Sequence, residues 1–180
     1  MLEDIQEVLL SRETLKEKAK ELGKRISQDY KGKDLVVICV LKGGVVFYAD
    51  LIREIDIPID LDFMAVSSYG ASTRSSGVVK ILKDLDTNIT DKHVLIVEDI
   101  IDTGLTLKHL KELLSTRGPL SVKLCAALDK PSRRKVDIDV EYKGIEIPDM
   151  FVIGYGLDYM GKYRNLPDVC VLKPSVYTKE

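Results

Sequence analysis

Hydrophobic residues in this chain form two recurring patterns, short continuous runs and stripes with helical spacing. Leu35 to Val40 and His93 to Val97 are runs of strand length, typical of strands buried on both faces of a sheet. Apolar residues at helical spacing mark residues 12–30 and the stretch through Leu107 to Leu114. Such strands alternating with amphipathic helices predict an α/β fold, with a mainly parallel central sheet flanked by helices.

Turn residues and shorter patterns complete the predicted elements. Ser11 can cap the first helix, and Pro58 breaks a second helix that runs through Val46 to Ile52. The charged stretch from 129 to 137 is predicted to be a loop. No strand is predicted in the first ten residues or in the tail from 156. Further strands are predicted at 59–65, 78–82, 122–128, 138–142 and 150–155.

Length and charge narrow the class of protein. The 180 residues predict one domain spanning 1–180, and 27 basic against 29 acidic residues disfavour nucleic-acid binding through a basic surface. We expect a cytoplasmic protein without a membrane partner, because no apolar run is long enough to span a bilayer and the N-terminus lacks a signal peptide's features. The three cysteines lie far apart without a CxxC pair, which favours buried reduced thiols: Cys39, Cys125 and Cys170.

Polar residues that follow the run 93–97 are the strongest candidates for chemistry, because ligands bind at the carboxyl ends of strands in such sheets. Glu98 and Asp99 sit where the strand is predicted to end, and Asp102 opens the turn. These carboxylates suit ribose hydroxyls or a hard cation such as Mg²⁺, and Asp102 can also accept a proton. Free N–H groups and small hydroxyl side chains suit a phosphate at the predicted start of the next helix, at Thr103, Gly104 and Thr106.

A purely structural interpretation of these residues stays open. Asp102 or Thr103 could simply cap the helix, with the other acids favouring its positive end. Capping explains one acid, but it does not explain two more acids directly after four buried apolar residues. Motifs of other enzyme classes are missing from the sequence: it has no Walker loop, no dinucleotide-binding G-x-G-x-x-G after a strand, no G-x-S-x-G and no H-E-x-x-H.

Residues 94–106, VLIVEDIIDTGLT, resemble the phosphoribosyl-diphosphate motif of type I phosphoribosyltransferases, specifically of the hypoxanthine-guanine branch. Leu41 to Gly44 is similar to that family's pyrophosphate loop, and Ser68-Tyr69 to the signature of its flexible closing loop within 67–77. Further segments resemble its purine-binding and distal pyrophosphate segments, in family order: 128–131, 151–159 and 163–166.

The resemblance implies a type I phosphoribosyltransferase fold with a small hood from the terminal segments, mainly about 150–180. It implies transfer of the phosphoribosyl group from phosphoribosyl diphosphate to N9 of hypoxanthine or guanine, giving IMP or GMP and pyrophosphate. Glu98 and Asp99 would hold the ribose hydroxyls and Mg²⁺, and Asp102 would be the general base or hydrogen-bond partner at purine N7. The 5′-phosphate would lie against the backbone of Thr103, Gly104, Leu105 and Thr106.

The remaining roles are implied in the same way. Lys42, Gly43 and Arg164 would bind pyrophosphate, and Ser68 and Tyr69 would belong to a lid. The purine-binding residues would be Lys130 at the 6-oxo group, Phe151 on the base, Val152 at its edge, and Asp158, which would also ligate a second Mg²⁺. Taken singly, each of these residues could be a surface charge, a core aromatic or a turn residue. Some family members carry Lys at the position of Leu105. The leucine side chain offers no charge, so only the backbone N–H of Leu105 is implied to bind the phosphate.

Two alternatives remain open at this point. A regulator on the same fold would sense nucleotides and bind RNA or DNA, although the sequence has no added helix-turn-helix or basic domain. An adenine or pyrimidine phosphoribosyltransferase is chemically closer, but Lys130 and the segment from Phe151 to Asp158 argue against it. The sequence does not rank hypoxanthine, guanine and xanthine, and the resemblance suggests a homodimer or homotetramer.

Overall fold

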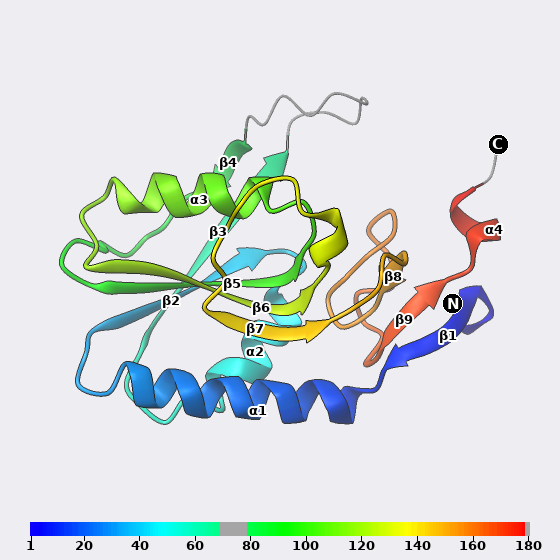
Figure 1. Cartoon of the computed structure of the whole chain (residues 1–180), viewed down its shortest axis with the longest axis horizontal. Coiled ribbons are helices and arrows are strands. Elements are labelled where there is room, and N and C mark those ends of the chain that lie inside the picture. Colours follow the sequence, from blue (N-terminus) through cyan, green and yellow to red (C-terminus); the bar gives the residue numbers. More distant parts are fainter. Residues whose placement is uncertain (69–78, 179–180) are drawn as a thin grey trace.

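The central sheet has six strands and is mainly parallel, as the alternating pattern predicts. The structure, a computed structural model, describes residues 1–68 and 79–178. The strand order is β4-β3-β2-β5-β6-β7, and only the pair β3 and β4 is antiparallel (Figure 1). The strands are β2 (Leu35–Leu41), β3 (Asp60–Ser68), β4 (Val79–Lys83), β5 (His93–Ile101), β6 (Ser121–Asp129) and β7 (Tyr142–Glu146).

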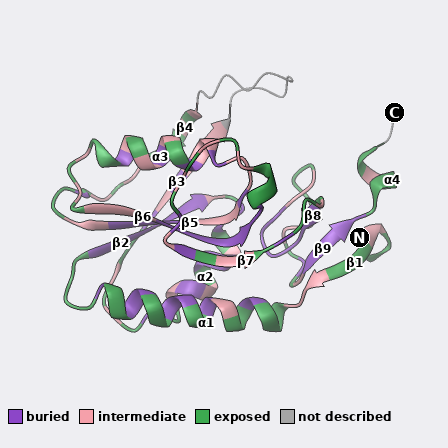
Figure 2. Cartoon of the chain, viewed as in Figure 1, coloured by how far each residue is buried: buried purple, intermediate pink, exposed green. Residues whose placement is uncertain are grey.

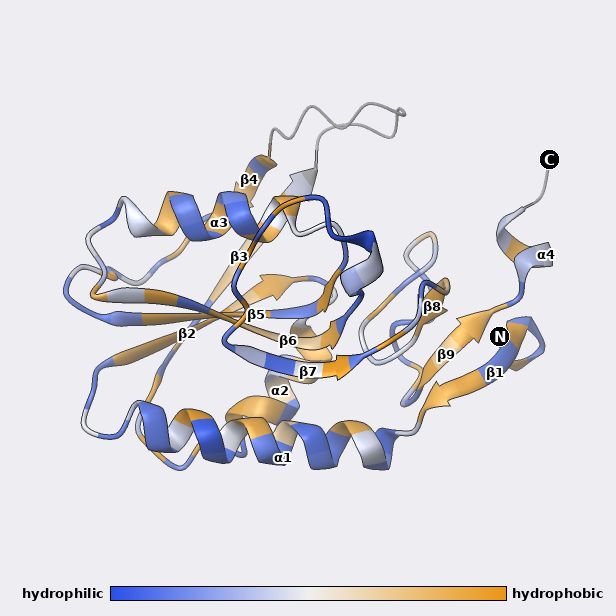
Figure 3. Ribbon diagram, in the orientation of Figure 1, coloured by the Kyte–Doolittle hydropathy of each residue, from blue (hydrophilic) through white to orange (hydrophobic). Residues whose placement is uncertain are grey.

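Helices cover both faces of this sheet. Helices α1 (Arg12–Asp29) and α2 (Val45–Ile52) lie on one face, and α3 (Leu105–Ser115) lies on the other (Figure 1). The first six residues of β2 are buried, and alternate ones belong to the core on either side, which is why this strand is continuously apolar (Figures 2 and 3). Ser11 caps α1 as predicted, because its hydroxyl accepts the N–H of Thr14. No helix in the described part of the chain has the length and apolar character needed to cross a membrane.

A second, three-stranded antiparallel sheet joins the two ends of the chain. Its order is β1-β9-β8, formed by β1 (Ile5–Leu10), β9 (Val169–Leu172) and β8 (Val152–Ile153). The short helices η1 (Leu2–Asp4) and α4 (Pro174–Tyr177) flank it in the sequence. Neither β1 nor β9 is predicted from the sequence. Residues 6–8 of β1 are exposed, so the strand has no buried stripe that the pattern could reveal.

Two details of the predicted elements are wrong, the break at Pro58 and the bounds of the strand at 138–142. Helix α2 ends at Ile52, six positions before Pro58, so the proline does not break it. Strand β7 covers Tyr142–Glu146 rather than 138–142, because pairing with β6 begins where Tyr142 meets Cys125. Ile138 and Val140 are apolar because they pack against the core beside α3 without joining the sheet. The predicted loop from 129 to 137 contains a single turn of 3₁₀ helix, η2 (Pro131–Arg133).

The strand order creates a crevice between β2 and β5. From β2 the chain passes through α2 to β3 on one side, and from β5 it passes through α3 to β6 on the other side. The two connecting segments thus turn away from each other, and neither crosses over the gap between the carboxyl ends of β2 and β5. This is the place where ligands bind in open α/β sheets.

Candidate active site

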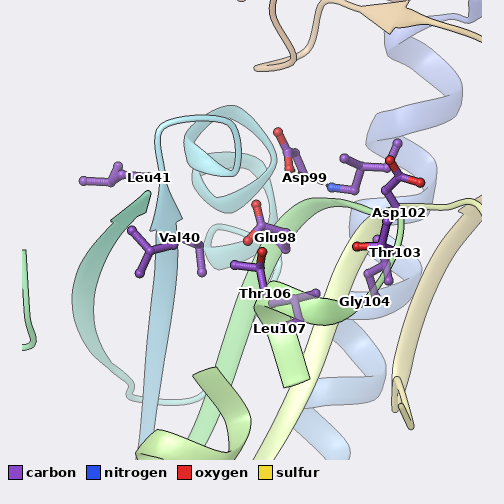
Figure 4. A pocket seen from close by; sticks show the side chains of 12 residues that line it. Val40, Leu41, Glu98, Asp99, Asp102, Thr103, Gly104, Thr106 and Leu107 are labelled. Carbon is purple, nitrogen blue, oxygen red and sulfur yellow. Dashed lines mark hydrogen bonds between the residues drawn. The ribbon is translucent and has the colours of Figure 1, made fainter. Parts of the chain in front are cut away.

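The carboxyl ends of β2 and β5 line a pocket of about 290 Å³ (Figure 4). Strand β5 continues to Ile101, which pairs with Asp129, so Glu98 and Asp99 lie inside the strand rather than after it as predicted. Backbone pairing with β6 thus continues beyond the apolar run at 93–97. The sequence-predicted residues that the pocket brings together are Glu98, Asp99, Asp102, Thr103, Gly104 and Thr106.

The regular alternation of β5 breaks at the two carboxylates. Val97 and Ile100 both pack into the core beside α1 and α2, whereas strict alternation would direct them to opposite faces. Glu98 and Asp99 lie between them, and both line the same pocket (Figure 4). Burial and the neighbouring Asp99 charge raise the pKa of Glu98 well above its usual range. Burial also raises the pKa of Asp99, although the N–H of Ile100 and the charge of Arg164 act in the opposite direction.

The raised pKa values predict that this pair costs stability in the free protein. A carboxyl group whose pKa is raised by folding favours the folded state at low pH, and this contribution is lost as pH rises through the raised value. We therefore expect Asp99→Asn to raise the Tm by a few degrees near pH 8, and by less near pH 4, in the absence of metal and substrate.

Thermal unfolding of both proteins in the presence of a chelator measures this difference. Asp84→Asn is the matched control of opposite sign, because the hydrogen bond from Arg117 lowers the pKa of Asp84. A Tm that falls in Asp99→Asn at both pH values would contradict the prediction.

The start of α3 is set by a glycine and not by a side-chain cap. The helix begins at Leu105, and the residue before it is Gly104 with a φ of 81° and no side-chain capping bond. Asp102 therefore does not cap the helix, whereas the Thr103 hydroxyl accepts the Leu105 N–H over a long distance of 3.4 Å. Glycine adopts this positive φ without strain and leaves the first N–H groups of α3 beside the pocket.

The loop after β2 is packed tightly between Asp99 and the segment that follows β8. The Leu41–Lys42 peptide is cis, Lys42 is exposed and Gly43 is buried. A Cβ on Gly43 would lie 1.7 Å from the Asp99 carboxylate oxygen Oδ2. A Cβ on Gly156 would lie 2.1 Å from the Gly43 carbonyl oxygen, and Gly156 has a φ of 100°. Only glycine fits at both positions.

These two contacts predict different outcomes for alanine. In Gly43→Ala the obstructing atom is the end of the Asp99 side chain, so the carboxylate must turn away while the backbone stays in place. We expect kcat/KM to fall about 100-fold or more with little change in Tm. In Gly156→Ala the obstructing atom belongs to the backbone and the φ is unfavourable, so the Tm itself should fall. Steady-state kinetics and thermal unfolding separate the two effects, and an active Gly43→Ala enzyme would contradict the assignment of this loop.

A second pocket of about 370 Å³ adjoins the first and shares Ile100 and Asp102 with it. Lys130 lines this pocket and is buried, with 8% of its surface exposed. The interpretation of Lys130 as a solvated surface charge is therefore wrong. Its ammonium group donates to the Met150 carbonyl oxygen at 2.6 Å, and burial lowers its pKa. The pocket also contains Arg133, Asp149, Phe151, Val152 and Asp158.

Phe151 is not a core residue, because 39% of its surface is exposed. Its ring stacks on Tyr177 of α4 at 4.9 Å and meets the edge of Tyr159 at 5.6 Å. Val152 is the first residue of β8 and pairs with Val171, which fixes the backbone that borders the pocket. This pocket therefore combines a supported aromatic ring, a strand edge and a buried cation.

Arg164 contacts Asp158, which lines the second pocket. Arg164 forms an ion pair of 2.6 Å with Asp158 and donates to the Gly156 carbonyl oxygen, also at 2.6 Å. The second Asp158 oxygen accepts the N–H of Gly161 at 2.7 Å. Within residues 1–68 and 79–178, no group of three His, Cys, Asp or Glu side chains is close enough to enclose a metal ion. Asp158 thus does not join Glu98 and Asp99 in one cluster.

Two further outcomes concern the predicted lid and residues that the sequence did not suggest. Ser68 is the last residue of β3, and Tyr69 with the rest of the expected lid lies outside the described residues. Arg133 and Arg134 were not predicted to belong to the site, yet both bond to Asp102. The only signal in the sequence is that they follow Lys130 closely, and the charged stretch around them resembles an ordinary loop.

Comparison with known proteins adds an independent line of evidence. The model of the phosphoribosyl transferase domain family matches residues 6–160. A hypoxanthine-guanine phosphoribosyltransferase of Bacillus subtilis is 54% identical, over 98% of this chain and 98% of that protein. One from Streptococcus thermophilus is 52% identical, over 99% and 100%. The crystal structure of a hypoxanthine phosphoribosyltransferase from Staphylococcus aureus is similar with a TM-score of 0.96 and 51% identity, over 99% and 97% of the two chains.

Proposed function

The chain belongs to the phosphoribosyltransferase family, and we propose that its two adjoining pockets form the active site. Relatives that match almost its whole length make it a hypoxanthine-guanine phosphoribosyltransferase, an enzyme of purine salvage. The fold expected from the sequence, a mainly parallel sheet flanked by helices with a small hood region, is confirmed. The single observation that supports the site proposal is that Asp102 borders both pockets, one lined by carboxylates and the other by Lys130 and Phe151.

In the proposed reaction, N9 of the base forms a bond to C1′ of the sugar, and the bond from C1′ to pyrophosphate breaks. The base enters with a proton on N7, and that proton passes to the Asp102 carboxylate, so the product nucleotide is neutral at N7. Asp102 suits this role because it lies at the boundary between the sugar side and the base side. The pyrophosphate departs with the electron pair of the broken bond.

The pocket at the end of β5 is proposed to hold the sugar and its 5′-phosphate. Glu98 and Asp99 accept hydrogen bonds from the ribose hydroxyls, and the N–H groups at the start of α3 bind the phosphate. Leu105 contributes only its backbone, while the hydroxyls of Thr103 and Thr106 supply additional donors. Gly104 allows the backbone to approach the phosphate closely.

Glu98 and Asp99 also fit a hard divalent cation such as Mg²⁺. Their ligand atoms are oxygens only, and their raised pKa values indicate that the protein alone supplies too little positive charge for two neighbouring carboxylates. Because the described residues provide no third carboxylate at this position, substrate and water oxygens would complete the coordination. A bound Mg²⁺ supplies charge neutralisation for the departing pyrophosphate.

The pyrophosphate itself is proposed to lie between the loop after β2 and Arg164. The Lys42 side chain and the Gly43 backbone approach it from one side, and Arg164 approaches it from the other. Arg164 is held by Asp158 and the Gly156 carbonyl oxygen, so little side-chain freedom is lost when the anion binds. These cations stabilise the charge that develops as the bond to C1′ breaks.

The base is proposed to lie in the second pocket. Lys130 donates to its 6-oxo oxygen, Phe151 stacks on its face, and the backbone at Val152 contacts its edge. Asp158, assigned from the sequence to the base and a second Mg²⁺, reaches this pocket but has both oxygens engaged by Arg164 and Gly161. We therefore propose that its metal role requires release of one of these bonds.

Turnover with defined substrates tests the proposal. The protein is incubated with phosphoribosyl diphosphate, Mg²⁺ and either hypoxanthine or guanine, and formation of IMP or GMP and pyrophosphate is followed. A parallel filter-binding experiment with RNA tests the nucleotide-sensing alternative. Equal amounts of nucleotide and pyrophosphate with no RNA retention support the enzyme, whereas RNA retention without turnover favours the regulator. A homodimeric or homotetrameric state and a cytoplasmic location stay predictions.

A further inference from the structure

Asp102 is held by two consecutive arginines that follow Lys130. The Arg133 Nε donates to the Asp102 carboxylate oxygen Oδ1 at 2.7 Å, and the Arg134 Nη1 donates to the Asp102 carbonyl oxygen at 3.1 Å. Arg134 also bonds to Asp129 at the end of β6. The side chain and the backbone of Asp102 are therefore fixed by separate guanidinium groups from one turn.

The pair between Arg133 and Asp102 is too exposed to serve mainly the fold. The Arg133 side chain is 45% exposed and that of Asp102 is 41% exposed. Exposed ion pairs contribute little to stability, because water screens the charges and the side chains lose freedom. Both residues line the base pocket, so the pair lies where chemistry is proposed to occur.

The geometry leaves one Asp102 oxygen available to the substrate. Arg133 engages Oδ1, and a carboxylate has further acceptor sites on its second oxygen. A guanidinium cannot accept the proton that leaves purine N7, since it remains charged at all working pH values. Arg133 can thus orient the carboxylate without competing for the proton.

A second contact connects this pair to the segment that carries Phe151. The Arg133 Nη1 lies 3.5 Å from the Asp149 carboxylate oxygen Oδ2, and Lys130 donates to the carbonyl oxygen of the next residue, Met150. The turn from 130 to 133 therefore contacts the 149–150 segment twice. Arg133 is placed between the proton acceptor and the wall of the base pocket.

We propose that Arg133 is a positioning residue for the transfer reaction. It holds the Asp102 carboxylate by Oδ1 so that the other oxygen meets N7 of the bound base, with Asp149 fixing the far end of the guanidinium. This inference rests on the proposed role of Asp102 in phosphoribosyl transfer. If Arg133 has a positioning role, its replacement slows the chemical step, and this effect depends on the presence of the Asp102 carboxylate.

The test combines Arg133→Gln with Asp102→Asn in a double-mutant cycle. The rate of a single turnover at saturating substrates is measured, because product release can limit kcat in the steady state. We expect Arg133→Gln to slow the single turnover roughly 10- to 100-fold, and Arg133→Lys to recover part of the rate. In the Asp102→Asn background the same change should alter the rate by less than about twofold, because the oriented group is gone.

A remote arginine provides the matched control. Arg117 forms two bonds to Asp84, at 2.7 and 2.9 Å, and lines neither pocket, so Arg117→Gln should keep the wild-type rate. A wild-type rate in folded Arg133→Gln, or an equal loss in both backgrounds, overturns the inference while the proposed function stands. A wild-type protein that forms no nucleotide from either base overturns both.

Discussion

Replacing Asp102 with alanine slows nucleotide formation by about 10²- to 10⁴-fold, the usual contribution of a positioned proton acceptor. The loss should appear in kcat with hypoxanthine, because the carboxylate acts on N7 while N9 bonds to the sugar. The fold should be retained, since Asp102 does not cap α3 and its side-chain bond to Arg133 is at the surface. Steady-state kinetics together with thermal unfolding measure both parts of this expectation.

The control for this variant is a carboxylate of similar exposure that also pairs with an arginine. Asp84 meets this description through Arg117 and lines neither of the two pockets, so Asp84→Ala should keep the wild-type kcat. If Asp102→Ala is folded and turns over at the wild-type rate, Asp102 has no part in the mechanism and the inference on Arg133 fails with it.

Discrimination against adenine is the second large effect that we expect, and Lys130 is its cause. The buried ammonium has three donors, of which one is used by the Met150 carbonyl oxygen. The 6-oxo oxygen of hypoxanthine or guanine accepts another, whereas the exocyclic amine of adenine is a poor acceptor. A base that covers Lys130 without accepting from it leaves a buried charged donor unpaired, and sites of this kind reject such analogues by up to about 10⁴- to 10⁵-fold.

The values of kcat/KM for hypoxanthine, guanine and adenine measure this preference. In wild type we expect both 6-oxopurines to be far better substrates than adenine. In Lys130→Ala most of the difference should disappear through loss of the 6-oxopurine activity. Comparable use of adenine by wild type would contradict the assignment of the base pocket, and a variant with undiminished preference would place the selecting group elsewhere, for instance at the backbone of Val152.

Local patterns in the sequence predict the centre of the large sheet because β2 and β5 are buried on both faces. The continuous apolar runs of β2 and β5 arise from cores on either side, so periodicity alone locates them. Of the small sheet, only β8 is predicted, as the longer strand at 150–155, and the other two strands are not. In β1 the residues 6–8 are exposed, and β8 has only two residues, so their pairing with β9 depends on contacts between distant parts of the chain.

Some residues of the site can likewise be recognised from the local sequence, whereas others are recognised only from contacts between distant parts of the chain. Glu98, Asp99 and Asp102 are visible because three acids follow an apolar run, which folding alone does not explain. Arg133 looks like a residue of a charged loop, and only the structure shows that η2 returns to Asp102. Gly156 likewise resembles a flexible position, while its contact with the Gly43 carbonyl oxygen depends on how the segment after β8 packs on the loop after β2.

One nucleotide is proposed to span the two pockets that share Asp102. A crystal structure of the protein with GMP, pyrophosphate and Mg²⁺ tests it most directly. We predict the phosphate at the start of α3, the ribose hydroxyls at Glu98 and Asp99, and the 6-oxo oxygen within hydrogen-bonding distance of the Lys130 ammonium group. A base bound away from Lys130 and Phe151, or a phosphate bound away from α3, would contradict the account.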